Sequence, residues 1–262
     1  MTRWVAFAGV AVLVLAVLLV LARASQSVVS DISTAPDRWL DRLPDGADHL
    51  DATATPRPLQ SSRDPSSVAL LLNVAVSQGI FATVLLAAVW WAQVPMSTLG
   101  VSGDPWSTGW PALAVGVGAG IALVFANTLA GGLARAVERD PSERLRELLA
   151  PDSAAGWLLL LFAVLPTIAV FEELLFRAVL IGAFSAGFDL SPWLLAVVSS
   201  VAFAVGHGAQ GGLGVVVTGL LGFALAVVFV VTNSLLAVVV AHYLVNAAEF
   251  VVAEGLGWEP FG

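Results

Sequence analysis

Three short patterns between residues 171 and 246 hold the side chains best suited to chemistry. Residues 171–177 read FEELLFR, residues 203–207 read FAVGH, and residues 242–246 read HYLVN. Together they offer two carboxylates, an arginine, two imidazoles and an amide, all within otherwise apolar stretches. A carboxylate can take a proton from water, and imidazole and amide groups can donate hydrogen bonds to an oxyanion. The set is therefore chemically sufficient for peptide hydrolysis.

The first pattern predicts different roles for its two carboxylates, Glu172 and Glu173. Glu173 and Arg177 are four residues apart, so on a helix they share a face and can pair. Glu172 projects about 100° away from Glu173 and is free to point into a cavity. The alternative is an ion pair that only locks helices together. Two adjacent carboxylates carry more charge than one arginine balances, which disfavours a purely structural site.

The two imidazoles each have a structural alternative when taken alone. His207, at the edge of the glycine-rich stretch 206–214, could be a hydrogen-bonded interior side chain. His242 and Asn246 share a helix face and could form a hydrogen-bonding stripe between helices, with Glu249 close to it. A metal site is a further alternative, in which Glu172, His207 and His242 hold Zn²⁺ and lower the pKa of a bound water toward about 7. No HExxH occurs in the sequence, so the helix of soluble zinc proteases is absent.

The composition indicates the environment of these patterns. Of the 262 residues, 58% are hydrophobic and 11% are charged, against roughly 25% charged in soluble domains. The chain is too apolar for a disordered protein, too acidic at net charge −8 for a nucleic-acid-binding protein, and without cysteine for a disulfide scaffold. An integral membrane protein remains. Its expected partners are membrane lipid and a membrane-associated peptide or protein, with no nucleic acid, and the oligomeric state is unknown.

The hydrophobic runs predict an all-α fold, a polytopic membrane helical bundle of about seven transmembrane helices. The spans are expected at residues 4–22, 68–92, 111–134, 157–184, 191–206, 213–232 and 235–253. Three parts follow from this order: a variable leading region 1–156 with three spans and a polar loop 23–67, a catalytic membrane core 157–253 of four helices, and a short tail 254–262. Pro166 is expected to kink the fourth span. Three glycines are expected to let a neighbouring helix approach the third span closely, namely Gly116, Gly118 and Gly120.

The first span has a competing interpretation as a cleaved signal peptide, because Ala22-Arg23-Ala24 resembles a cleavage site. Its apolar run exceeds the 7–15 residues usual for a signal core, which favours a retained span. Nine of the eleven arginines lie in the segments 23–67 and 135–156. By the positive-inside rule these segments face the cytoplasm and the N-terminus lies outside, in a multi-pass protein of the cell membrane.

Helix rise allows the depths of the site residues to be compared. Glu172 lies about 22 Å along its span from Trp157, and His242 lies about 10 Å from the start of its span at the opposite face. In a hydrocarbon core about 30 Å thick these two depths coincide. His207 lies about 21 Å past Trp193, measured from that same opposite face, and is therefore expected too deep to match them.

In order and spacing, the three patterns resemble the motifs of the CAAX prenyl protease type II and bacteriocin-processing (CPBP) family of intramembrane endopeptidases. The family pattern is EExxxR, then FxxxH, then HxxxN. The resemblance implies a peptidase, a hydrolase whose family is often labelled metalloprotease, with Zn²⁺ as the cofactor that label suggests. It also implies roles: general base for Glu172, its support for Glu173 and Arg177, water or metal partner for His207, and oxyanion binding for His242 and Asn246.

Two other functions use the same residue types. A proton- or ion-coupled transporter also places Glu, His and Arg in the membrane. Against it, no repeat relates the two halves of the chain, and the polar groups gather in the last four spans. A non-catalytic membrane scaffold or immunity protein could keep the motifs without turnover. The resemblance favours hydrolysis of a membrane-associated peptide or protein over both.

Overall fold

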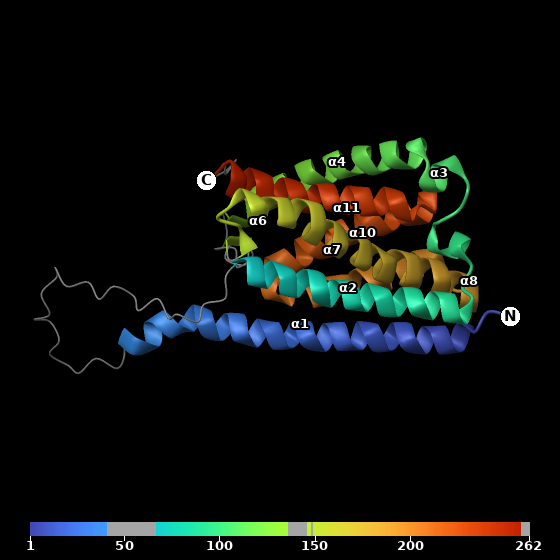
Figure 1. The fold of residues 1–262 in the computed structure, drawn as a ribbon, viewed down its shortest axis with the longest axis horizontal. Helices are drawn as coiled ribbons and strands as arrows, with labels where there is room; N and C mark the ends of the chain where they lie inside the picture. Colours follow the sequence, from blue (N-terminus) through green and yellow to red (C-terminus); the bar gives the residue numbers. More distant parts are fainter. Residues whose placement is uncertain (41–66, 136–145, 148, 258–262) are drawn as a thin grey trace, which may run out of the picture.

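The computed structural model describes residues 1–40, 67–135, 146–147 and 149–257, with the backbone alone for 25–40 and 131–135. Over these ranges the chain is a bundle of long helices that run side by side (Figure 1). Six helical segments are long and apolar enough to cross a membrane. The predicted all-α polytopic bundle is thereby confirmed. The count of seven is not, because the predicted fifth span is a helix of 15 residues, about 22 Å long against a core of about 30 Å.

The elements follow the predicted order of spans. Short helical turns occupy the 93–110 connection and the glycine-rich stretch; they are η2 (Met96–Leu99), α3 (Pro105–Thr108) and η5 (Gly208–Gln210). The long helices are α1 (Trp4–Leu40), α2 (Ser67–Ala92), α4 (Trp110–Arg135), α9 (Pro192–Gly206), α10 (Gly211–Thr232) and α11 (Leu235–Phe250), which continues as η6 (Val251–Gly255).

The fourth span is one continuous helical segment with two π-helical stretches. It consists of α6 (Ala154–Leu159), η3 (Leu160–Val164), α7 (Leu165–Glu173), η4 (Leu174–Ala183) and α8 (Phe184–Phe188). The first π-helical stretch directly precedes Pro166, whose ring and missing N–H disturb the regular helix there. The second begins immediately after Glu173 and carries Arg177. π-Helical turns are rare and are frequent at functional sites.

Helix α1 extends further than predicted and packs into the core. It continues to Leu40, through residues 23–40 where the beginning of the polar loop was expected. Residues 41–66 of that loop lie outside the described residues. Phe7, Ala11 and Val14 are buried in the same cluster as Phe171 and Phe203. The proposed cleavage site therefore lies within a helix whose inner face completes the core, which favours a retained span.

The arginine-rich segments attach to one end of the bundle. The C-terminal ends of α1 and α4 and the beginning of α6 lie at that end, opposite the N-terminus (Figure 1). This agrees with the prediction that segments 23–67 and 135–156 share a face. That the face is cytoplasmic stays a prediction.

The beginning of α11 is fixed by the turn that precedes it. Asn233 adopts the left-handed conformation with φ 47°. The Ser234 hydroxyl accepts a hydrogen bond from the Ala237 amide at 3.1 Å and donates one to the Ser107 carbonyl at 2.7 Å. This N-cap satisfies a free amide of the first turn and ties α11 to α3. The position of His242, two turns later, is thus set from its helix end.

Close packing of α4 on α11 gives a prediction for the glycines of α4. A Cβ on Gly116 would lie 2.7 Å from the Ala237 carbonyl oxygen, and one on Gly120 would lie 2.9 Å from the Leu244 side chain. We expect Gly116→Ala to lower the free energy of unfolding by about 1–3 kcal/mol through overpacking. Thermal unfolding of the purified protein in detergent measures this change.

Gly118 provides the matched control on the same helix. A Cβ there would meet nothing within 4 Å, so the expected close approach holds for its two neighbours but not for Gly118. Gly118→Ala should leave stability unchanged or raise it by up to about 1 kcal/mol, because alanine favours the helix. Equal destabilisation by both substitutions would contradict the described packing.

Candidate active site

Four of the predicted site residues form a single buried cluster between α7, η4 and α11. Glu172 and Glu173 lie near the middle of the segment Ala154–Phe188, and both are buried together with Arg177 and His242. Glu173 is 0% exposed and Arg177 is 1% exposed. Ionisable groups at such depth are costly unless they pair with one another. Their contacts show that they do.

Glu173 bridges two helices through one oxygen atom. Its Oε1 accepts a hydrogen bond from Arg177 Nη1 at 2.8 Å, which is the predicted pair four residues apart. The same atom accepts a second hydrogen bond, from His242 Nδ1 on α11, at 2.6 Å. Charge-assisted bonds of this length are among the stronger ones in proteins. Glu173 therefore fixes the orientation of the His242 ring.

Arg177 connects the cluster to two further helices. Its Nη2 donates to the Gly222 carbonyl of α10 at 2.8 Å, and its guanidinium carbon lies 4.8 Å from the centre of the Phe203 ring on α9. A Cβ on Gly222 would lie 2.9 Å from Phe203 and 3.3 Å from Arg177 Nη2. The absence of a side chain at Gly222 is what allows this approach.

Glu172 faces the other nitrogen of the same imidazole. Glu172 Oε2 and His242 Nε2 are 3.6 Å apart. This separation is longer than a direct hydrogen bond. Because Nδ1–H donates to Glu173, a neutral His242 presents Nε2 as an acceptor toward Glu172. Two carboxylates thus flank one imidazole.

His207 stands apart from this cluster. It ends α9 and is half-buried, its Nδ1 donates to the Phe203 carbonyl at 2.8 Å, and its ring centre lies 4.4 Å from that of Phe203. Within the described residues no hydrogen bond or ion pair joins it to Glu172 or His242. Phe203 lies between them, with its ring centre 6.1 Å from that of His242. That His207 lies too deep to match the other site residues stays a prediction.

The remaining polar residues of α11 divide into two groups. Asn246 is half-buried one turn beyond His242 and, in the described part of the chain, makes no hydrogen bond to the four clustered side chains. Glu249, which the sequence grouped with this face, lies 3.5 Å from Arg146, and Arg146 also donates to Glu254 at 2.7 Å. Glu249 therefore serves an ion-pair network at the end of the helix.

The predicted Zn²⁺ ligands do not form one set. Among the residues that the structure describes, no group of three or more His, Cys, Asp or Glu is placed to hold a metal ion. A catalytic zinc site in a protein has three protein ligands. Of the three predicted ligands, Glu172 and His242 are close together and His207 is not.

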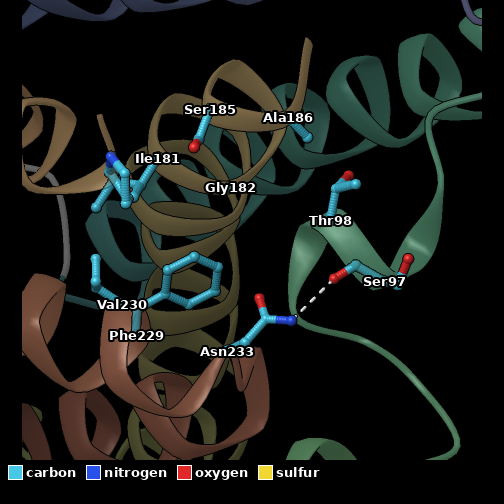
Figure 2. Close-up of a pocket in the computed structure, with 10 residues that line it drawn as sticks. Ser97, Thr98, Ile181, Gly182, Ser185, Ala186, Phe229, Val230 and Asn233 are labelled. Carbon is cyan, nitrogen blue, oxygen red and sulfur yellow. Dashed lines mark hydrogen bonds between the residues drawn. The ribbon is translucent and has the colours of Figure 1, made fainter. Parts of the chain in front are cut away.

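A pocket of about 430 Å³ lies at the α8 end of the bundle, where residues of η2, η4, α8 and the end of α10 line it (Figure 2). Polar groups around it already have partners: Asn233 Nδ2 donates to the Ser97 carbonyl at 3.1 Å, and the Ser185 hydroxyl donates to the Leu190 carbonyl at 2.8 Å. Its lining residue Gly182 is ten positions beyond Glu172 on the same segment, about 15 Å along the axis. This pocket is not the candidate site.

Three buried side-chain atoms in the described part of the chain lack a hydrogen-bond partner. Two belong to the cluster, Glu173 Oε2 and Arg177 Nε, and the third is Gln78 Oε1 on α2. Gln78 lies outside the three sequence motifs. The available signal was an amide inside an apolar span, which is costly when it has no partner.

The fold and the cluster define a multi-pass membrane protein with a buried carboxylate–imidazole site. Residues 154–248 match the family described as Type II CAAX prenyl endopeptidase Rce1-like, and this range includes all six predicted site residues. The match agrees with the resemblance drawn from the three motifs and confirms it for these residues. The match supports an intramembrane endopeptidase of the CAAX type, a peptidase. No curated protein and no solved structure matches the chain.

Proposed function

We propose that the protein hydrolyses a peptide bond in a membrane-associated peptide or protein, with the attacking water activated by Glu172. One observation carries the proposal: Glu172 and Glu173 lie 3.6 Å and 2.6 Å from opposite nitrogens of the buried His242 ring. A water placed beside Glu172 Oε2 and His242 Nε2 could contact both acceptors.

In the proposed reaction, the water donates one hydrogen to Glu172 and the other to His242 Nε2. Its oxygen attacks the peptide carbonyl carbon as Glu172 takes the first proton. Glu172 then returns this proton to the leaving amide nitrogen as the C–N bond breaks, which yields a carboxylic acid and an amine. Glu173, held by Arg177, keeps the imidazole in the required tautomer, the task that a carboxylate performs in hydrolase triads.

Asn246 is proposed to stabilise the oxyanion of the tetrahedral intermediate. It lies one turn beyond His242 on α11, is half-buried, and its amide is not engaged with the cluster. An amide donor aimed at the developing negative charge contributes strongly in a water-poor site. We assign no proton transfer to His207, which contacts Phe203 and not Glu172. Its role as a water or metal partner rests on the family resemblance alone.

A cleavage assay with the purified full-length protein in lipid nanodiscs tests the proposal. Three probes are compared by mass spectrometry: a farnesylated peptide ending in a CAAX tetrapeptide, the same peptide without the lipid, and an apolar membrane-spanning peptide. We expect cleavage of at least one, and the first is suggested by the family's description. Absence of cleavage of all three would contradict the proposed function. A parallel series with a chelator tests whether Zn²⁺ takes part.

A further inference from the structure

We propose that Gln78 on α2 is a substrate-binding residue whose side-chain amide pairs with the backbone of the peptide held beside Glu172. The proposal rests on the proposed function and adds to it the group that positions the substrate. Gln78 lies outside the matched range 154–248, so the family match assigns it nothing.

Gln78 lies on the inner face of α2, between two apolar clusters. On one side, Leu71 and Ala75 pack in a cluster that α7 and α11 share. On the other side, Phe81 and Leu85 pack in the cluster that includes much of η4. These positions follow the spacing of three and four residues that marks one helix face. Gln78 is therefore the polar member of an otherwise apolar stripe.

The depth of Gln78 matches that of the candidate active site. The rings of Phe81 and Phe171 are stacked with their centres 5.8 Å apart. Helices α2 and α7 run in the same direction (Figure 1), and Gln78 lies one turn before Phe81. Glu172 directly follows Phe171, so the two side chains start within about 6 Å of each other along the bundle axis.

Helix α11 packs beside the contact between α2 and α7. Tyr243, which directly follows His242, packs in the same cluster as Ala75 on α2. The region where α2, α7 and α11 meet therefore contains Glu172 and Gln78 at neighbouring levels along the bundle axis, with His242 adjacent. A peptide bound beside Glu172 would therefore also lie near the Gln78 amide.

The chemistry of the amide fits a peptide backbone. Gln78 Oε1 is buried and has no hydrogen-bond partner. An unpaired carbonyl oxygen in an apolar interior costs free energy, so a residue there without a function would be better replaced by an apolar one. A peptide unit offers one N–H donor and one C=O acceptor, and a carboxamide offers the complement of each. The expected ligand is thus the main chain of an extended substrate next to the cleaved bond.

The substitution Gln78→Met tests this role, because methionine has a similar length and no amide. We expect KM for a cleaved probe peptide to rise about ten-fold with kcat little changed, as for loss of a hydrogen bond made equally in ground and transition states. The melting temperature should stay the same or rise, since an unpaired buried oxygen is removed. Asn73→Leu is the matched control on the lipid-exposed face of α2 and should change neither KM nor kcat.

Two results would overturn the proposal. An unchanged KM in Gln78→Met would show that the amide does not contact substrate, and a lower melting temperature with unchanged kinetics would assign it a structural role. Binding of the uncleaved probe is compared between the Glu172→Gln variant and the double variant Glu172→Gln with Gln78→Met. This comparison distinguishes failure of the Gln78 proposal from failure of the proposed function. Weaker binding in the double variant supports the Gln78 role even if the wild-type protein cleaves no probe, whereas equal binding contradicts it.

Discussion

Replacement of Glu172 by glutamine is expected to lower kcat about 10³-fold, because an amide of the same shape cannot take the proton of the attacking water. The side chain is buried and lies 3.6 Å from His242 Nε2, so the substitution keeps the packing and removes only the base. KM should change little, since binding of the peptide does not depend on the proton transfer. Initial rates of cleavage of the best probe peptide in nanodiscs measure the effect.

Glu147→Gln is the control for loss of one negative charge, because Glu147 is exposed. This variant should keep the wild-type rate. The melting temperature of Glu172→Gln, measured beside the rate, shows that the variant is folded and inserted. A folded Glu172→Gln protein with near wild-type turnover would remove Glu172 from the role of base.

Replacement of Arg177 by methionine is expected to cost about 3–5 kcal/mol of stability, the largest loss of any single substitution in the cluster. It would leave Glu173 charged, 0% exposed and without its cation, and it would leave the Gly222 carbonyl without its donor. Breaking a buried pair by removing one partner is strongly destabilising for this reason. Thermal unfolding in detergent and the yield of folded protein check the expectation.

The double variant Arg177→Met with Glu173→Met distinguishes stability from function. Replacing both ions by apolar side chains removes the stranded charge, so much of the lost stability should return. Turnover should stay low, because His242 Nδ1 then lacks the carboxylate that orients the ring. Wild-type stability of Arg177→Met alone, or full activity of the double variant, would contradict the role given to this pair.

The parts of the fold that depend on local sequence were predictable. Span positions follow from uninterrupted apolar runs, and the α10–α11 turn follows from Asn233-Ser234, whose conformation and cap the structure shows. The pairing of Glu173 with Arg177 follows from their spacing on one helix face. Each of these features is decided within a few residues.

The parts that depend on tertiary packing were not predictable. The bond between Glu173 and His242 joins residues 69 positions apart, and no spacing rule reaches across helices. The contact of His207 with Phe203 depends on how the end of α9 packs. Helix α1 reaches Leu40 through polar residues that a hydropathy pattern assigns to a loop. Gln78 belongs to no motif, and that its Oε1 is buried without a partner is seen only in the structure.

The most direct test of the central claim, that Glu172 and His242 act on the same water, is the rate of the double variant Glu172→Gln with His242→Gln beside both single variants. Residues that act as one unit give losses that do not add. We predict that the double variant is no slower than the slower single variant. Losses that multiply would mean that the two residues act independently, and that result would contradict the proposed site.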